Sequence, residues 1–125
     1  MPTKTKTKLP DKRSDLIELA LHDMKLARDT PGYRLSMGAW HLPANGVCHV
    51  CMAGAVMAFT LKIPDSEKVR FPSESFPEET SNKLRFLNDV RDRADYVGGR
   101  IPFKRFQKIA ASYRNDPERD CAPWG

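Results

Sequence analysis

The sequence predicts a mainly α fold, a single-domain bundle of about four helices around a buried central helix at residues 47–61. That segment, VCHVCMAGAVMAFTL, has only His49 and Thr60 as clearly polar side chains. A helix that is apolar nearly all round must be buried on most sides. The segment is also too short to span a bilayer, which needs about 20 residues. Apolar residues recur at helical spacing in three flanking segments, near 14–28, 79–97 and 102–114.

The two ends of the chain differ in composition from the middle. With 125 residues, the chain is long enough for one domain with a modest core. Residues 1–13 (MPTKTKTKLPDKR) have almost no apolar side chains, so we expect a disordered basic tail. Residues 115–125 are polar and interrupted by proline, except for Trp124, so we expect a flexible C-terminal tail. The helical domain is therefore expected at 14–114.

The segment before the central helix contains one helix and one ambiguous stretch. Ser14 is expected to cap a helix that runs to about Arg28, and Thr30-Pro31-Gly32 ends it. Residues 33–40 alternate between apolar and polar side chains, which favours a short strand or an extended segment. Residues 41–46 (HLPANG) are expected to form a turn.

Small residues give the central helix a slim surface. Gly54 lies between alanines, and a glycine inside a helix costs about 1 kcal/mol relative to alanine. Close packing of neighbouring helices is the usual compensation. After an acidic, proline-containing loop at 64–77, the helical period resumes, is interrupted at Gly98-Gly99, and continues after Pro102.

Charge is distributed unevenly along the chain. The net charge is +5, and residues 1–13 contribute +4 of it, from five basic and one acidic side chain. Residues 65–79 carry five acids and two bases, a net −3, whereas residues 83–114 carry nine bases and three acids, a net +6. Such asymmetry can orient a partner and raise its association rate.

This polarity defines the expected binding surface, in which an acidic loop and two basic helices engage a partner protein. Aromatic residues in loops can be partner anchors, so Phe76 is included. The expected contact residues are Glu74, Phe76, Glu78, Glu79, Arg91, Arg93, Lys104, Arg105 and Lys108.

Nucleic acid is the alternative partner. Lys104, Arg105 and Lys108 share one side of the last expected helix, and a basic tail precedes the fold. Lysine and arginine contacts to phosphates give salt-dependent affinity that does not depend on sequence. The helix–Gly-Gly–helix layout is similar to a helix-turn-helix. Interleaved acids (Asp89, Asp92 and Asp95) favour the simpler interpretation, a solvated helix face with internal ion pairs.

The cysteines allow a third interpretation. Cys48 and Cys51 are spaced C-x-x-C, and Cys48 is expected near a helix N-terminus, where a thiol pKa falls. A zinc site needs four ligands, and Cys48, Cys51, Cys121 and His41 are the weak candidates. Dithiol redox enzymes place this motif in a βαβ context, which the sequence lacks. Buried thiols that act as small apolar side chains are the favoured interpretation.

The segment from Trp40 to Ala58, with Gly46-Val47-Cys48-His49-Val50-Cys51 followed by Met52-Ala53-Gly54-Ala55-Val56-Met57-Ala58, resembles the core motif of small uncharacterised proteins of tailed phages and prophages. The likeness covers about residues 33–61. It implies a phage protein acting inside a bacterium and names no activity or catalytic residue.

Together these observations predict a small non-enzymatic accessory protein that binds a host bacterial protein, as an inhibitor or modulator. We expect no cofactor and no membrane association. The basic N-terminus is not followed by an apolar signal-peptide core, so the expected location is the cytoplasm of an infected or lysogenic bacterium. Reduced thiols are expected in that compartment.

Overall fold

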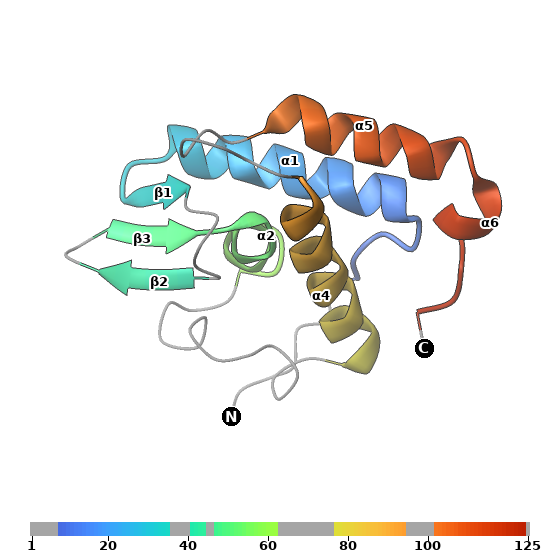
Figure 1. Ribbon diagram of the computed structural model, residues 1–125. Coiled ribbons are helices and arrows are strands. Elements are labelled where there is room, and N and C mark those ends of the chain that lie inside the picture. The colour runs from blue at the N-terminus through green and yellow to red at the C-terminus, as the bar shows by residue number, and fades with distance from the viewer. Residues whose placement is uncertain (1–7, 36–40, 45–46, 63–76, 95–101, 125) are drawn as a thin grey trace.

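The computed structural model describes residues 8–35, 41–44, 47–62, 77–94 and 102–124, with the backbone alone at 41–44, 48 and 49. The described chain is mainly helical, as the sequence predicts (Figure 1). Four of its helices form the body of the fold: α1 (Arg13–Asp29), α2 (Met52–Phe59), α4 (Glu78–Arg93) and α5 (Phe103–Arg114). A short helix, α6 (Pro117–Asp120), follows α5. No helix within the described ranges is both long and apolar enough to cross a membrane.

A three-stranded sheet lies beside α2, on the side of the molecule away from α6 (Figure 1). Its strands are β1 (Tyr33–Leu35), β2 (His41–Ala44) and β3 (Val47–Val50), in the order β1-β3-β2. The β1 strand is parallel to β3, with Tyr33 opposite Cys48, and β2 is antiparallel to β3, with Ala44 opposite Val47. The expected strand near 33–40 is therefore present at 33–35, and residues 36–40 lie outside the described residues.

The central helix is shorter than expected, because residues 47–50 belong to β3 and the helix begins only at Met52. The prediction of helix from residue 47 was wrong, as was the simple turn at 41–46. Asn-Gly between two short apolar runs is a strong hairpin signal in a sequence. The hairpin was missed because the apolar run is continuous, and without a period such a run does not distinguish a buried strand from a buried helix.

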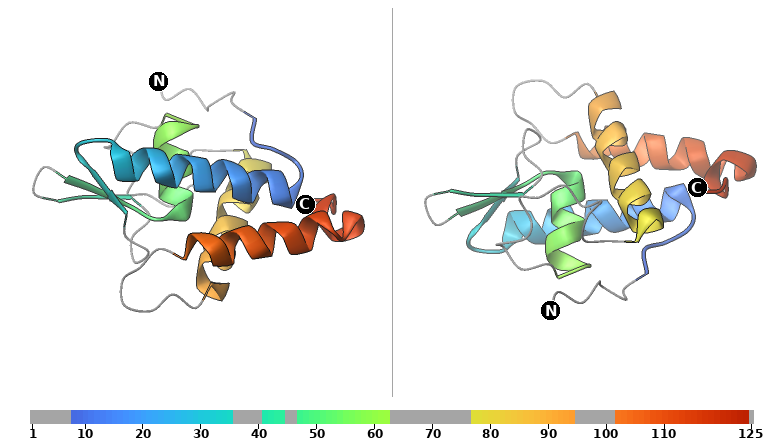
Figure 2. Two further views of the ribbon diagram at one scale, coloured as in Figure 1. Left: turned by 90° about the horizontal axis from the view of Figure 1, so that it is seen from above. Right: turned by 90° about the horizontal axis from the view of Figure 1, so that it is seen from below.

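The core forms around α1, which packs against α2, α5 and β1, and around α2, which also packs against α4. Every residue from Val50 to Met57 is buried, including Ala53 and Gly54, so the slim surface of α2 is covered as its composition predicts. Figure 2 shows α1 and α5 side by side, with α4 crossing them. Their buried apolar faces include Leu16, Ile17, Met24, Leu84, Leu87, Val90 and Phe106.

The beginning of α1 is capped by Asp120, the last residue of α6. The N-cap position of α1 is Lys12, which makes no side-chain capping bond, so the expected cap by Ser14 was wrong. Instead, the Asp120 carboxylate accepts hydrogen bonds from the Ser14 backbone N–H at 2.7 Å and from its hydroxyl at 2.8 Å. An anion at this position also meets the positive end of the α1 dipole. Asp120 is only 5% exposed.

Residues on both sides of the expected domain limits pack against the helices. Leu9 is buried, and its carbonyl oxygen accepts a hydrogen bond from Lys83 Nζ at 2.9 Å. The indole N–H of Trp124 donates to the carbonyl of Asp11 at 2.8 Å, and the Arg13 guanidinium lies 4.0 Å from the Trp124 ring centroid. The described parts of 1–13 and 115–125 thus belong to the packed structure, because Leu9 and Trp124 bury apolar surface that the expected tails would leave in water.

One buried carboxylate makes stability depend on pH. Asp23, in α1, is 2% exposed and accepts a hydrogen bond from the Thr60 hydroxyl. Burial raises the pKa of Asp23, and the Thr60 hydrogen bond and the charge of His22 offset this only in part. The folded-state pKa of Asp23 therefore lies above the unfolded value of 3.8. The contribution of protonated Asp23 to the free energy of unfolding is complete below pH 3.8 and is lost as pH rises through the folded-state pKa.

We therefore expect Asp23→Asn to raise the free energy of unfolding at neutral pH. The asparagine amide oxygen still accepts the hydrogen bond from the Thr60 hydroxyl, and the variant no longer buries a charge. The gain should shrink as pH is lowered toward 3.8, where the wild-type carboxyl is increasingly protonated. Urea unfolding of both proteins across this range measures the difference. A variant that is equally destabilised at every pH would contradict the assignment.

Candidate functional site

The exposed side of α5 is the most strongly basic helical surface that the structure describes. We call Lys104, Arg105 and Lys108 the basic face; all three are exposed. Phe106, Ala110 and Tyr113 occupy the opposite, buried side of the helix. At 3.6 residues per turn, Lys104 and Lys108 are neighbours one turn apart. The basic face therefore points away from the core.

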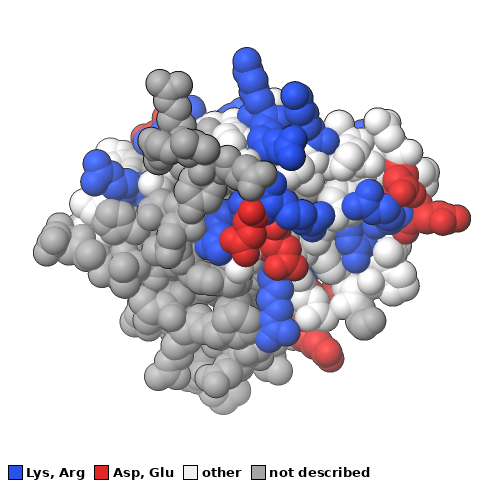
Figure 3. Space-filling view, viewed as in Figure 1, with Lys and Arg blue, Asp and Glu red and all other residues white. Residues whose placement is uncertain are grey.

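None of these three cations is neutralised by a described neighbour. The twelve residues of α5 include no aspartate or glutamate. Lys104, Arg105 and Lys108 form no ion pair with any residue in the described part of the chain. Figure 3 shows lysine and arginine side chains gathered along the upper edge of the molecule, where α5 begins. The site thus presents several positive charges to solvent.

The neighbouring α1 contributes cations at one end of α5. Lys25 Nζ lies 5.7 Å, and Arg28 Cζ 5.9 Å, from the ring centroid of Phe103, the first residue of α5. At the other end, Arg114 Nη2 lies 2.8 Å from Glu18 Oε2 and 3.9 Å from Asp15 Oδ1. These carboxylates raise the pKa of Arg114. The positive potential is therefore concentrated on the N-terminal half of α5.

The expected α4 arginines are already engaged. The Arg91 side chain is 15% exposed and lies 2.8 Å from Asp92 Oδ1. Arg93 donates a hydrogen bond to the Tyr113 hydroxyl at 3.3 Å. The structure thus brings Arg93 next to α5 but uses both side chains in contacts within the fold. Arg91 and Arg93 therefore add less positive charge to the basic face than a count of basic residues along the sequence indicates.

Two of the expected acidic residues, Glu78 and Glu79, lie at the start of α4, and Figure 1 shows that this end of the helix points away from α5. Glu78 and Glu79 are exposed in its first turn, while Glu74 and Phe76 lie outside the described residues. Glu79 Oε1 lies 3.1 Å from Lys83 Nζ. The structure therefore separates the described acids from the basic face rather than joining them in one surface.

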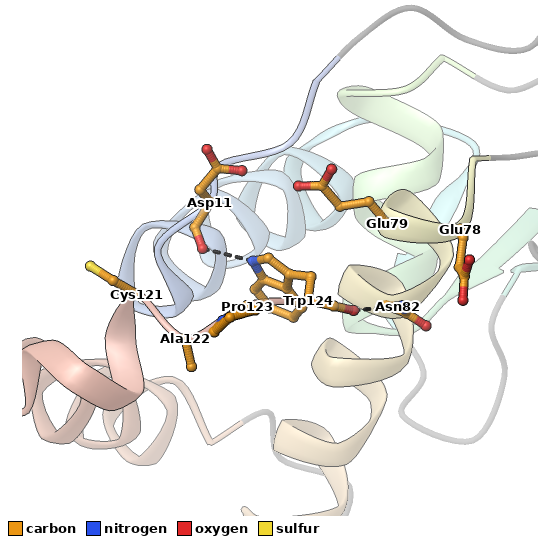
Figure 4. A pocket seen from close by; sticks show the side chains of 8 residues that line it. All are labelled: Asp11, Glu78, Glu79, Asn82, Cys121, Ala122, Pro123 and Trp124. Atoms are coloured by element: carbon orange, nitrogen blue, oxygen red, sulfur yellow. Dashed lines mark hydrogen bonds between the residues drawn. The ribbon is translucent and has the colours of Figure 1, made fainter.

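A pocket of about 500 Å³ opens beside these glutamates and is lined in part by Trp124. Figure 4 shows Trp124 between Asp11 and Asn82; the amide of Asn82 donates to the Trp124 carbonyl at 2.7 Å. Lys83 Nζ lies 3.0 Å from Asp11 Oδ1 and also binds Glu79. This buried ammonium lowers the pKa of Asp11. Two of the pocket's three carboxylates are thus already paired, which leaves little charge to attract a cation.

The cysteines are placed apart. Cys51 is fully buried at the N-cap of α2, where its sulfur accepts a hydrogen bond from the Gly54 N–H at 3.5 Å. Cys121 is exposed after α6, and both are thiols rather than disulfides. The side chains of Cys48 and His41 lie outside what the structure describes. Within the described ranges, no group of three or more His, Cys, Asp or Glu side chains could hold a metal ion.

Burial raises the pKa of the Cys51 thiol, although the Gly54 N–H and the charge of Arg91 act in the opposite direction. We therefore expect iodoacetamide to alkylate Cys121 rapidly and Cys51 only after unfolding, because the thiolate is the reactive form. Peptide-level mass spectrometry after a short exposure measures both sites in one sample. Alkylation of Cys51 at the rate of Cys121 would instead support a reactive thiol.

Sequence reasoning found the α5 residues but missed those of α1. Helical period alone places Lys104, Arg105 and Lys108 on one side of α5. Lys25 and Arg28 lie near them only because α1 packs against α5, and no sequence pattern within α1 predicts that contact. Comparison of the chain with protein-family models, curated proteins and solved structures found no match.

Proposed function

We propose that this chain is a non-enzymatic binding protein that uses the basic face of α5 to engage the phosphates of nucleic acid. The observation that carries this proposal is a helix without a carboxylate, whose three exposed cations are unpaired among the described residues. Such cations displace the counterions condensed on a nucleic acid and gain affinity from their release. The buried Cys51 thiol, with its raised pKa, supports binding rather than nucleophilic chemistry.

The composition of the described surface favours nucleic acid over a protein partner. Stable protein interfaces centre on buried aromatic or aliphatic anchors surrounded by a polar rim. Among the described residues, Leu26 is the one large apolar side chain that is exposed, at 39%. Phosphate recognition needs only cations and polar donors, and the basic face supplies them.

A host bacterial protein with an acidic surface is the second candidate. The resemblance of residues 33–61 to small phage proteins favours it, as does the separation of Glu78 and Glu79 from α5 (Figure 1). A partner with its own charge asymmetry would be oriented by this arrangement. In this version the protein acts in the cytoplasm of an infected bacterium, and Glu74 and Phe76 add to the contact.

A pull-down from bacterial lysate, with and without nuclease, separates the two candidates. Immobilised full-length protein is incubated with each lysate, and retained nucleic acid and protein are both quantified. We expect nucleic acid in the untreated sample, and loss of co-retained proteins after nuclease treatment. One specific protein retained equally in both samples, without nucleic acid, would overturn the first candidate in favour of the second.

A further inference from the structure

We infer that the nucleic acid bound by this chain is double-stranded, and that Lys25 of α1 extends the basic face across the line of contact between α1 and α5. This inference rests on the proposed function and deepens it. It assigns a contact residue on a second helix and names the form of nucleic acid. The partner is the sugar-phosphate backbone of the duplex, so binding does not depend on sequence.

The position of Phe103 shows how the two helices share one surface. Its ring lies 5.7 Å from Lys25 Nζ and 5.9 Å from Arg28 Cζ, and Lys104 is the next residue of α5. Packed helices run about 8–10 Å apart. Lys25 therefore lies at the same end of the helix pair as Lys104, and the packing of α1 against α5 holds both elements in place.

The two α1 cations are not equivalent. The Arg28 side chain donates to Asp29 at 3.1 and 3.4 Å, which neutralises much of its charge locally. Lys25 is exposed and forms no ion pair with a described residue. Lys25 is therefore the α1 side chain that should contribute most to phosphate binding.

The aromatic side chains of α5 offer no free stacking surface beside the basic face, which favours the duplex over a single strand. Proteins that bind single strands combine a basic groove with aromatic side chains on which the bases stack. On α5, Phe106 and Tyr113 are buried, and Phe103 is partly buried beside two cations. A duplex keeps its bases stacked internally and presents a regular array of phosphates, about one charge per 1.7 Å of axis. The basic face of α5, with Lys25 of α1 beside it on a second packed helix, suits that array.

The test compares Lys25→Gln with Lys12→Gln in the full-length protein. Both lysines are exposed and belong to α1 or its N-cap, about 20 Å apart along the helix. Each variant removes one charge. Fluorescence anisotropy measures affinity for a mixed-sequence duplex and for one of its strands over a series of salt concentrations. Thermal unfolding checks that both variants fold.

We expect the wild type to bind the duplex more tightly than the strand. Lys25→Gln should weaken duplex binding about three- to tenfold and reduce the slope of log affinity against log salt by about 1, while Lys12→Gln stays within about twofold of wild type. Tighter binding to the single strand, or equal losses in both variants, would overturn the inference and leave nucleic-acid binding intact. If neither form of nucleic acid binds, the proposed function fails as well.

Discussion

Replacing Asp120 with alanine is expected to lower the free energy of unfolding by about 3–5 kcal/mol. Its carboxylate accepts two hydrogen bonds from Ser14, at 2.7 and 2.8 Å, and Ser14 is only 1% exposed. A hydrogen bond to a charged group contributes about 1.5–3 kcal/mol, and a buried donor left without a partner carries its full desolvation cost. The substitution also removes the anion at the positive end of the α1 dipole.

Urea unfolding monitored by circular dichroism measures this effect. Glu118→Ala is the matched control, because Glu118 lies in the same short helix but is exposed, and surface substitutions usually change stability by less than about 0.5 kcal/mol. Ser14→Ala should cost about 1.5–3 kcal/mol, less than Asp120→Ala, since it removes the hydroxyl's bond to Asp120 while the backbone N–H keeps its own. If the Asp120→Ala variant were as stable as the Glu118→Ala control, the Asp120 carboxylate would not cap α1.

Removing the basic face should weaken nucleic-acid binding on the order of 100-fold at moderate salt. The triple variant Lys104→Gln, Arg105→Gln and Lys108→Gln replaces three exposed side chains by polar ones that suit a helix. If each cation meets one phosphate, the salt dependence of log affinity should become shallower by about 3. Stability should change little, because none of the three contacts the core.

The matched control is a triple glutamine variant at Lys8, Lys12 and Lys62, which are exposed and lie outside α5. It removes the same net charge, so it separates a localised site from a general effect of net charge. Anisotropy titrations with one duplex compare the two variants directly. Equal losses in both would mean that affinity follows total charge, and the assignment of the basic face would then be wrong.

Helical periodicity predicted most of the fold because α1, α4 and α5 each bury one side. For α1, the predicted range 14–28 lies within one residue of the observed Arg13–Asp29 at each end, although the cap expected at Ser14 was wrong. The β3 strand was missed because Val47–Val50 and the helix after it form one continuous apolar run. Such a run carries no period by which strand and helix can be distinguished. The Asn-Gly step before it was the signal that could have found the hairpin.

The contacts between distant segments were beyond local reasoning. Lys83 counts as one of the basic residues of its segment, yet it is 1% exposed and binds Leu9, Asp11 and Glu79. Its charge is consumed within the fold, whereas that of Lys104 is not. The role proposed for Lys25 also depends on packing, because it rests on which helix lies beside α1. Charge counted along a sequence therefore overstates some sites and misses others until the packing is known.

The salt dependence of duplex binding by the full-length wild-type protein tests the central claim most directly. If the basic face and Lys25 contact phosphates, log affinity should fall linearly with log salt, with a slope of about −3 to −4, at about −0.9 per phosphate contacted. Affinity should then drop more than about 40-fold between roughly 50 and 200 mM salt. An affinity that stays unchanged over this range, or no binding at low salt, would contradict the account.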